Sequence, residues 1–152
     1  MSFKKTSSFV VIAVILIFLI LLYILASNSN SEVCMGNNCF NVELAKTPEE
    51  LSRGLMYLSS LDVDSGMLFI FKNEGKHPFW MKNTLIPLDI IWISKDKGII
   101  HISKNTPPCS TGPCQSYSPE NEALYVLEVN AGLSDKYGFK EGDKVEFNNI
   151  DL

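Results

Sequence analysis

Two acidic residues stand among aliphatic residues in segments that the sequence predicts to be β-strands, and such carboxyl groups can bind ligands or carry out acid–base chemistry. Because successive side chains of a strand point to opposite faces, Asp89 shares a face with two isoleucines, and Glu128 shares one with a leucine and a valine. A charge in such surroundings costs several kcal/mol unless it is paired. We therefore expect each of these acids to have a partner.

Arg53 is the expected partner, because it is the only arginine in the chain and its planar guanidinium suits a carboxylate. The sequence leaves three interpretations open. Arg53 can form a buried structural ion pair with Asp89 or Glu128. It can instead hold an anionic ligand that Asp89 orients. The two carboxyl groups can also act together as acid and base, as in a glycosidase.

The four cysteines form two pairs of identical spacing, with four residues between the members of each pair. An even number of cysteines outside the cytoplasm indicates disulfides, and two local bridges, Cys34–Cys39 and Cys109–Cys114, are the simplest connectivity. The alternative is one zinc ion bound by all four thiolates, which this spacing permits. Neither pair has the C-x-x-C spacing of a catalytic dithiol. We expect two disulfides, no metal and no cofactor.

An apolar run of 18 residues, from Phe9 to Ala26, predicts a transmembrane helix. At about 1.5 Å per residue it spans roughly 27 Å, close to the thickness of a bilayer core. A cleaved signal peptide is the alternative, although its apolar region is usually shorter. Lys4 and Lys5 precede the run and place the N-terminus in the cytoplasm. The predicted parts are a cytoplasmic tail (1–8), a membrane anchor (9–26), a linker (27–31) and an extracytoplasmic domain (32–152).

The outer segment is long enough for one domain. It holds all 17 acidic residues and 11 of the 13 basic ones, which argues against a nucleic-acid partner. Thr47, Pro48 and Glu50 form the signature of a capped helix start, and a predicted hairpin covers 88–103. Many short strands with one or two short helices indicate a mostly β (α+β) fold, in which a small antiparallel sheet curls or partly closes.

Several segments of this domain, in this order and spacing, resemble the domain-of-unknown-function 192 family of small prokaryotic proteins. They are Glu43-Leu44-Ala45, Arg53-Gly54-Leu55-Met56, Gly66-Met67-Leu68-Phe69, Phe79-Trp80-Met81-Lys82-Asn83-Thr84, Ile86-Pro87-Leu88-Asp89 and Leu127-Glu128-Val129-Asn130-Ala131-Gly132. The resemblance covers about residues 39–147 and implies a compact β-rich domain with a small helix. It implies no activity, because the family is uncharacterised. It keeps a ligand site possible at the matching polar or aromatic positions, which are Arg53, Trp80, Asn83, Asp89 and Glu128.

We expect binding rather than catalysis, because the chain has no G-x-S-x-G, phosphate-loop, H-E-x-x-H or Rossmann glycine motif, and no single nucleophile stands out. The expected partner of this extracytoplasmic domain is a small ligand from the cell envelope or another envelope protein. Two alternatives remain. One is a hydrolase that acts on cell-surface polymers through Asp89 and Glu128, and the other is a structural accessory domain without a ligand.

Overall fold

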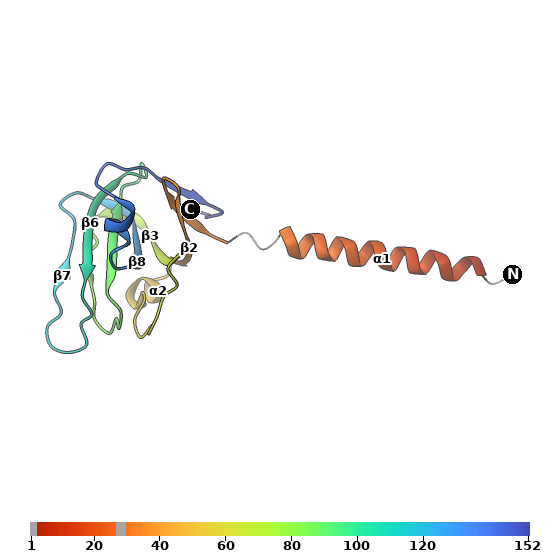
Figure 1. Cartoon of the computed structure of the whole chain (residues 1–152), viewed down its shortest axis with the longest axis horizontal. Helices are drawn as coiled ribbons and strands as arrows, with labels where there is room; N and C mark the ends of the chain where they lie inside the picture. Colours follow the sequence, from red (N-terminus) through yellow and green to blue (C-terminus); the bar gives the residue numbers. More distant parts are fainter. Residues whose placement is uncertain (1–2, 27–29) are drawn as a thin grey trace. The chain divides into compact units, whose positions relative to one another are not determined.

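A computed structural model describes the backbone of residues 3–26 and 30–152, and the side chains of residues 10–22 and 30–152. The chain forms two compact units, Met1–Asn30 and Ser31–Leu152. The first unit contains the helix α1 (Phe3–Ala26) (Figure 1). The predicted tail and linker include residues 1–2 and 27–29, which lie outside the described residues.

The structure does not support the predicted membrane anchor. Over the residues that it describes, no helix combines the length and the apolar character needed to cross a membrane. The anchor over residues 9–26 therefore stays a prediction from the sequence.

The second unit is built on a seven-stranded sheet with the order β6-β5-β8-β3-β2-β1-β9. Neighbouring strands in it are antiparallel except β2 and β3, which are parallel. The strands are β1 (Glu32–Met35), β2 (Asn38–Ala45), β3 (Ser65–Gly75), β5 (Leu88–Ile93), β6 (Ile99–Thr106), β8 (Ala123–Asn130) and β9 (Val145–Asn148). Two short strands, β4 (Phe79–Trp80) and β7 (Ser116–Tyr117), form a separate pair.

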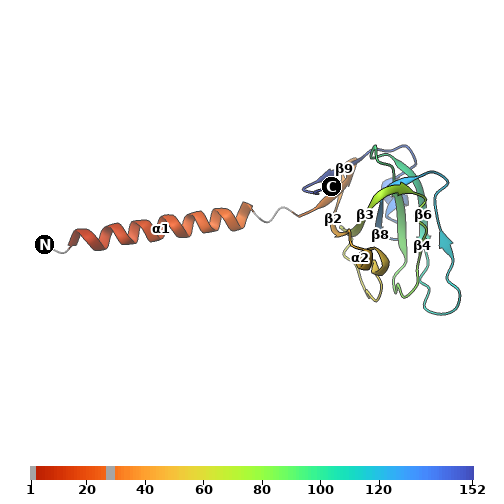
Figure 2. The same cartoon turned by 180° about the vertical axis from the view of Figure 1, so that it is seen from behind.

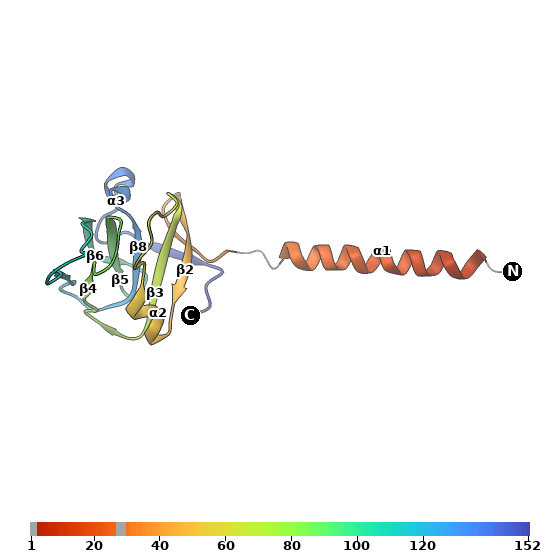
Figure 3. The same cartoon turned by 90° about the horizontal axis from the view of Figure 1, so that it is seen from below.

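The sheet curls until its two edges meet at one end. The segment that precedes β9 bonds to the start of β6, where the Ile99 amide donates to the Asp143 carbonyl at 2.9 Å. The Val145 amide donates to the Lys97 carbonyl at 2.9 Å, beside an isolated bridge between Gly98 and Lys144. Views from behind and below show the strands wrapping around a common interior (Figures 2 and 3). The predicted fold, a mostly β domain with a curled, partly closed sheet and short helices, is confirmed.

Each face of the sheet carries its own hydrophobic core. One core includes Ile99 and Val145, which come from the two edge strands, so it fills the concave side of the curl. The other core includes Trp92 and Val126. The helices α2 (Pro48–Arg53) and α3 (Leu133–Tyr137) lie on opposite sides of the sheet, α2 against the second core and α3 against the first (Figure 3).

The helix α2 begins as the sequence predicts. The Thr47 hydroxyl accepts a hydrogen bond from the Glu50 amide, and the Glu50 carboxylate accepts from the Thr47 amide, which together form a capping box. Pro48 occupies the first turn, where its missing N–H is no loss. The helix ends at Gly54, whose φ of 47° and ψ of −138° suit only glycine.

Both predicted disulfides are present. Cys34 and Cys39 lie directly opposite each other on β1 and β2, and their sulfurs are 2.04 Å apart. Cys109 and Cys114, with an S–S distance of 2.09 Å, close a loop before β7. This loop is fixed to the segment after β4, because the Cys109 amide donates to the Met81 carbonyl at 3.1 Å.

Candidate functional site

A pocket of about 260 Å³ lies between α2, the turn that follows it, β3 and the segment 77–80. Its wall is mostly apolar, with four aromatic side chains and several aliphatic ones. The aromatic members are Phe69, Phe71, Phe79 and Trp80. Few polar or charged side chains line it: Ser52, Arg53, His77, Thr84 and Glu128. An apolar pocket with a few converging polar groups is typical of a small-molecule site.

Glu128 stands on the central strand β8, between β5 and β3. Its cross-strand neighbours are Ile90 on β5 and Met67 on β3, both buried and apolar. The residue is only 4% exposed, and it lines the pocket. Across residues 30–152, no side chain or amide forms a hydrogen bond or ion pair with its carboxyl group. The carboxyl group therefore depends on whatever fills the pocket.

Burial in these surroundings raises the pKa of Glu128 to about 8. The cause is desolvation, which disfavours the charged form of a carboxyl group. At neutral pH the side chain is thus a neutral carboxylic acid, with one O–H donor and remaining acceptor capacity. This chemistry differs from that of an exposed carboxylate, which can only accept.

Two glycines let the backbone approach Glu128 closely. A Cβ at Gly66 would lie 2.6 Å from the Glu128 carbonyl oxygen, so only glycine permits this pairing of β3 with β8. A Cβ at Gly54 would lie 3.0 Å from Cζ of Phe69 and 3.7 Å from Oε2 of Glu128. The turn after α2 therefore passes directly over the carboxyl group.

Arg53 lines the pocket from the end of α2, and its side chain is exposed. The predicted ion pair with Asp89 or Glu128 is wrong, because no ion pair within 4.0 Å involves Arg53 in the described part of the chain. The acid one turn earlier on α2 is Glu50, whose pKa is lowered mainly by the amides of Thr47 and Lys46 and only slightly by Arg53. The guanidinium remains available to a ligand.

Asp89 lies outside the pocket and is satisfied by the backbone. It is fully buried, and its carboxylate accepts three N–H bonds. The Asn105 amide (2.8 Å) and the Gly132 amide (3.2 Å) donate to Oδ1, and the Ser134 amide (2.8 Å) donates to Oδ2. The predicted partner, a guanidinium, is replaced by three amides. Asp89 thereby ties β5 to the end of β6 and to the start of α3.

The two buried acids lie on opposite faces of the sheet. The register of β5 and β8 pairs Asp89 with Val129 and Ile90 with Glu128. Directly opposed residues of neighbouring strands share a face, so the two carboxyl groups point away from each other. The predicted acid–base pair is therefore wrong, and with it hydrolysis through Asp89 and Glu128 acting together.

The other two predicted site residues, Trp80 and Asn83, have different roles. Trp80 is half exposed at the pocket, and the Lys82 ammonium lies 5.1 Å from its ring centroid. Asn83 is not among the lining residues. Its side-chain amide donates to the Tyr57 hydroxyl at 2.8 Å, and its backbone amide donates to the Cys109 carbonyl at 3.0 Å. Asn83 therefore fixes the loops around the pocket.

His77 also belongs to the pocket, although the sequence analysis assigned it no role. The ring lines the pocket and stacks on Phe71, with 3.6 Å between the ring centroids. Its Nε2 bonds to the Asn73 carbonyl at 3.0 Å, and the His77 carbonyl accepts from the Trp92 indole at 3.0 Å. A single histidine in a turn carries no spacing that could have indicated this position.

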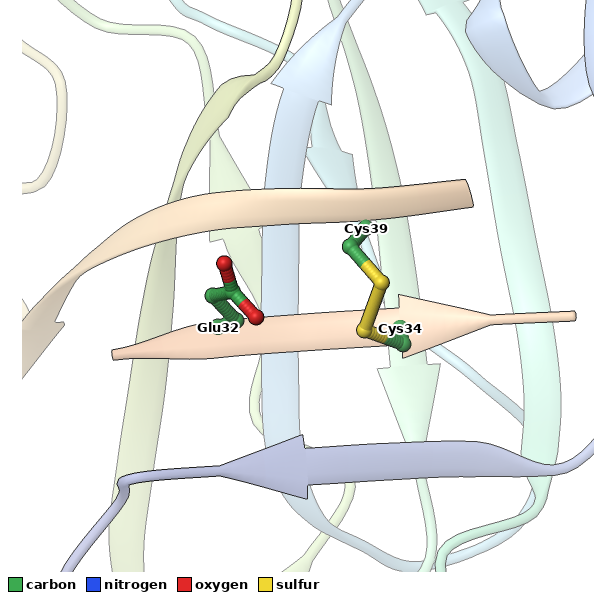
Figure 4. A group of neighbouring side chains, drawn as sticks. All are labelled: Glu32, Cys34 and Cys39. Atoms are coloured by element: carbon green, nitrogen blue, oxygen red, sulfur yellow. A yellow bond between two sulfur atoms is a disulfide. The ribbon is translucent and has the colours of Figure 1, made fainter. Parts of the chain in front are cut away.

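Away from the pocket, a group of potential metal ligands does not form a metal site while the disulfide is intact. One carboxylate oxygen of Glu32 and the sulfurs of Cys34 and Cys39 lie within 4.8 Å of one another (Figure 4). Both sulfurs are joined in the disulfide, and a thiolate rather than a disulfide sulfur binds metal. Of these three groups, only the Glu32 carboxylate can still bind a metal ion.

The fold and the site define a small, partly closed β-sheet domain with one unpaired carboxyl group at the floor of a largely apolar pocket. The chain belongs to the domain-of-unknown-function 192 (DUF192) family, described as "Uncharacterized ACR", which matches residues 31–147. This result confirms the resemblance seen in the sequence.

Three known proteins are similar to this chain in sequence or in structure. A UPF0127 protein of Thermococcus gammatolerans is 28% identical over 112 residues, which cover 70% of this chain and 66%, just under two thirds, of that protein. A crystal structure of a Novosphingobium aromaticivorans protein of unknown function is similar, with a TM-score of 0.70 and 37% identity, over 77% of this chain and 83% of that one. A crystal structure of a Sinorhizobium meliloti protein, described as a candidate transcription regulator, is also similar. Its TM-score is 0.70 and its identity 34%, over 78% of this chain and 92% of that one.

Proposed function

We propose that the domain binds a small molecule in the pocket over Glu128. The observation that carries this proposal is the Glu128 carboxyl group, which is 4% exposed, faces the pocket and has no partner in the described part of the chain. Folded proteins pair nearly all buried polar groups. The Glu128 carboxyl group opens only onto the pocket, so a ligand bound there can supply the hydrogen bonds that the protein does not.

The surroundings of Glu128 support a binding role over a structural one. A structural buried acid resembles Asp89, which has three backbone donors. Glu128 has none, and Gly54 leaves room above it where any other residue would narrow the pocket. Trp80 at the mouth offers a flat apolar surface to the ligand.

The domain acts outside the cytoplasm, held by an uncleaved N-terminal helix at residues 9–26, with the N-terminus in the cytoplasm. The apolar run, the two preceding lysines and the two disulfides support this location. Intact-mass measurement of the native membrane fraction should find residues 1–26 retained. A soluble form that starts near Ser27 would contradict the anchor.

A fragment screen by thermal shift, with the full-length protein in mild detergent, tests the binding function. We expect fragments with one ring and one hydrogen-bonding group to raise the Tm of the wild type and of Glu43→Leu, which alters an exposed strand residue. The same fragments should not raise the Tm of Glu128→Leu. If no fragment stabilises the wild type, or if the hits stabilise Glu128→Leu equally well, the pocket is not the binding site.

A further inference from the structure

We propose that the pocket selects a small monoanion with an apolar body, such as an aromatic or branched aliphatic carboxylate, whose charged group lies between Arg53 and the Glu128 carboxyl group. This inference rests on the proposed binding function and names its ligand class. It follows from three features of the pocket, namely its charge, the composition of its wall and its size.

The charged groups that face Glu128 come from two of the elements packed around it. On the sheet, the neighbouring strands contribute only Met67 and Ile90. On the other side of the pocket, the side chains that can carry a charge are Arg53 of α2 and His77 of the segment before β4. Because desolvation raises the pKa of Glu128 to about 8, the carboxyl group that lines this pocket is mainly protonated at neutral pH.

A cation would meet Arg53 in this pocket and would find no negative charge to compensate it. An anion finds a guanidinium and an O–H donor on residues that line the same pocket. Charge-assisted hydrogen bonds of this kind are about twice as strong as neutral ones. The Glu50 carboxylate does not compete strongly for Arg53, because the amides of Lys46 and Thr47 both donate to its Oε2 at 2.9 Å.

The wall favours a ligand with one polar group over a sugar, which carries several. His77 is occupied by its ring stacking and its bond to the Asn73 carbonyl. Most of the remaining lining is aromatic or aliphatic. A polyhydroxylated ligand would leave several hydroxyls without partners there, at a cost for each buried one. One charged group and one ring or branched chain match the surface better.

The size of the pocket limits the apolar body. Its volume of about 260 Å³ is below the roughly 300–1,000 Å³ of pockets that hold drug-sized ligands. The space suits a ligand with a single ring. Phenylacetate is a suitable probe, and two relatives of the same shape differ from it only in charge: phenylacetamide is neutral, and phenethylamine is cationic.

Calorimetric titration of the full-length protein in mild detergent at pH 7.5 tests the selectivity. We expect phenylacetate to bind at least tenfold more tightly than phenylacetamide, and phenethylamine to show no binding. Arg53→Gln should weaken phenylacetate binding at least tenfold, and Arg53→Lys should lose less. The control Lys140→Gln, which changes an exposed cation on a turn beyond α3, should bind like the wild type.

The same titrations at higher pH test the role of Glu128 as a donor. As Glu128 loses its proton above about pH 8, phenylacetate affinity should fall by up to tenfold per pH unit. Phenylacetamide binding should change much less, because the amide carries no charge for the new carboxylate to repel.

Three results would overturn this inference. They are equal binding of phenylacetate and phenylacetamide, undiminished phenylacetate binding by Arg53→Gln, and no phenylacetate binding to a wild type that melts cooperatively. The first result leaves the proposed binding function standing if Glu128→Leu abolishes binding of both probes. The fragment screen decides the proposed function by itself, so the two failures can be told apart.

Discussion

Glu128→Gln should be more stable than the wild type, and the difference in their free energies of unfolding should grow as the pH rises from 5 to 8. Burial holds the pKa of Glu128 at about 8, against 4.5 for an unperturbed glutamate. Between these values the folded protein keeps a proton that the unfolded chain has released. The unfolded state binds fewer protons, so the free energy of unfolding of the wild type falls as the pH rises. Glutamine removes this titration and keeps the shape of the side chain.

The expected size follows from the pKa difference. Each pH unit within this window costs the wild type about 1.4 kcal/mol, and the whole window costs about 5 kcal/mol, as an order-of-magnitude upper value. The advantage of Glu128→Gln should grow by that slope up to about pH 8 and then level off. Urea unfolding at pH 5, 6, 7 and 8, followed by the fluorescence of the fully buried Trp92, measures it.

The comparison uses the difference between variant and wild type, so the titration of other groups cancels. Glu43→Gln is a matched control, because it makes the same chemical change on an exposed strand position. The difference in the free energy of unfolding between Glu43→Gln and the wild type should stay constant from pH 5 to pH 8. If the Glu128→Gln difference is also constant from pH 5 to pH 8, the carboxyl group is ionised in the folded state, and the reasoning about its environment is refuted.

Three further predictions concern stability. Asp89→Ala leaves one buried and two partly buried amides unpaired and should lower the free energy of unfolding by about 3 kcal/mol, measured by urea unfolding, and a loss below about 1 kcal/mol would contradict this role. Gly54→Ala places a Cβ 3.0 Å from the Phe69 ring at a φ of 47° and should cost about 1–3 kcal/mol, so an unchanged Tm would count against the strain. The double change of Cys109 and Cys114 to serine should cost about 2 kcal/mol in urea unfolding, since the closed loop is short, and no loss would contradict this role. Reductant breaks both disulfides of the wild type, so its addition should cost at least as much as the double change.

Local features of the domain could be predicted from the sequence because their determinants are close together in the chain. The capping box needs only Thr47 and Glu50, and each disulfide closes over a separation of five residues. The alternation within a strand is equally local. It correctly grouped Asp89 with isoleucines and Glu128 with a leucine and a valine, and it showed that both positions would be buried.

The arrangement of the site could not be predicted, because it depends on how distant segments meet. Alternation shows which residues of one strand share a face, but only the register between β5 and β8 shows which faces coincide. A shift of one residue would have placed both acids on the same side of the sheet. The partners of Asp89 were missed for a similar reason. They are backbone amides 16 to 45 residues away, which no side-chain pattern indicates.

The sequence argument also assumed that a buried acid needs a cation, and the two acids show why that is too narrow. Asp89 is satisfied by three amides, so removing its carboxylate should destabilise the protein. Glu128 has no such donors and keeps its proton instead, so replacing its titratable carboxyl group with an amide should stabilise the protein above about pH 5. Asp89 and Glu128 both stand among aliphatic residues on a strand, yet their substitution should change the stability of the protein in opposite directions. The acid whose removal stabilises the fold is the one that the fold alone does not require, which is the property expected of a binding residue.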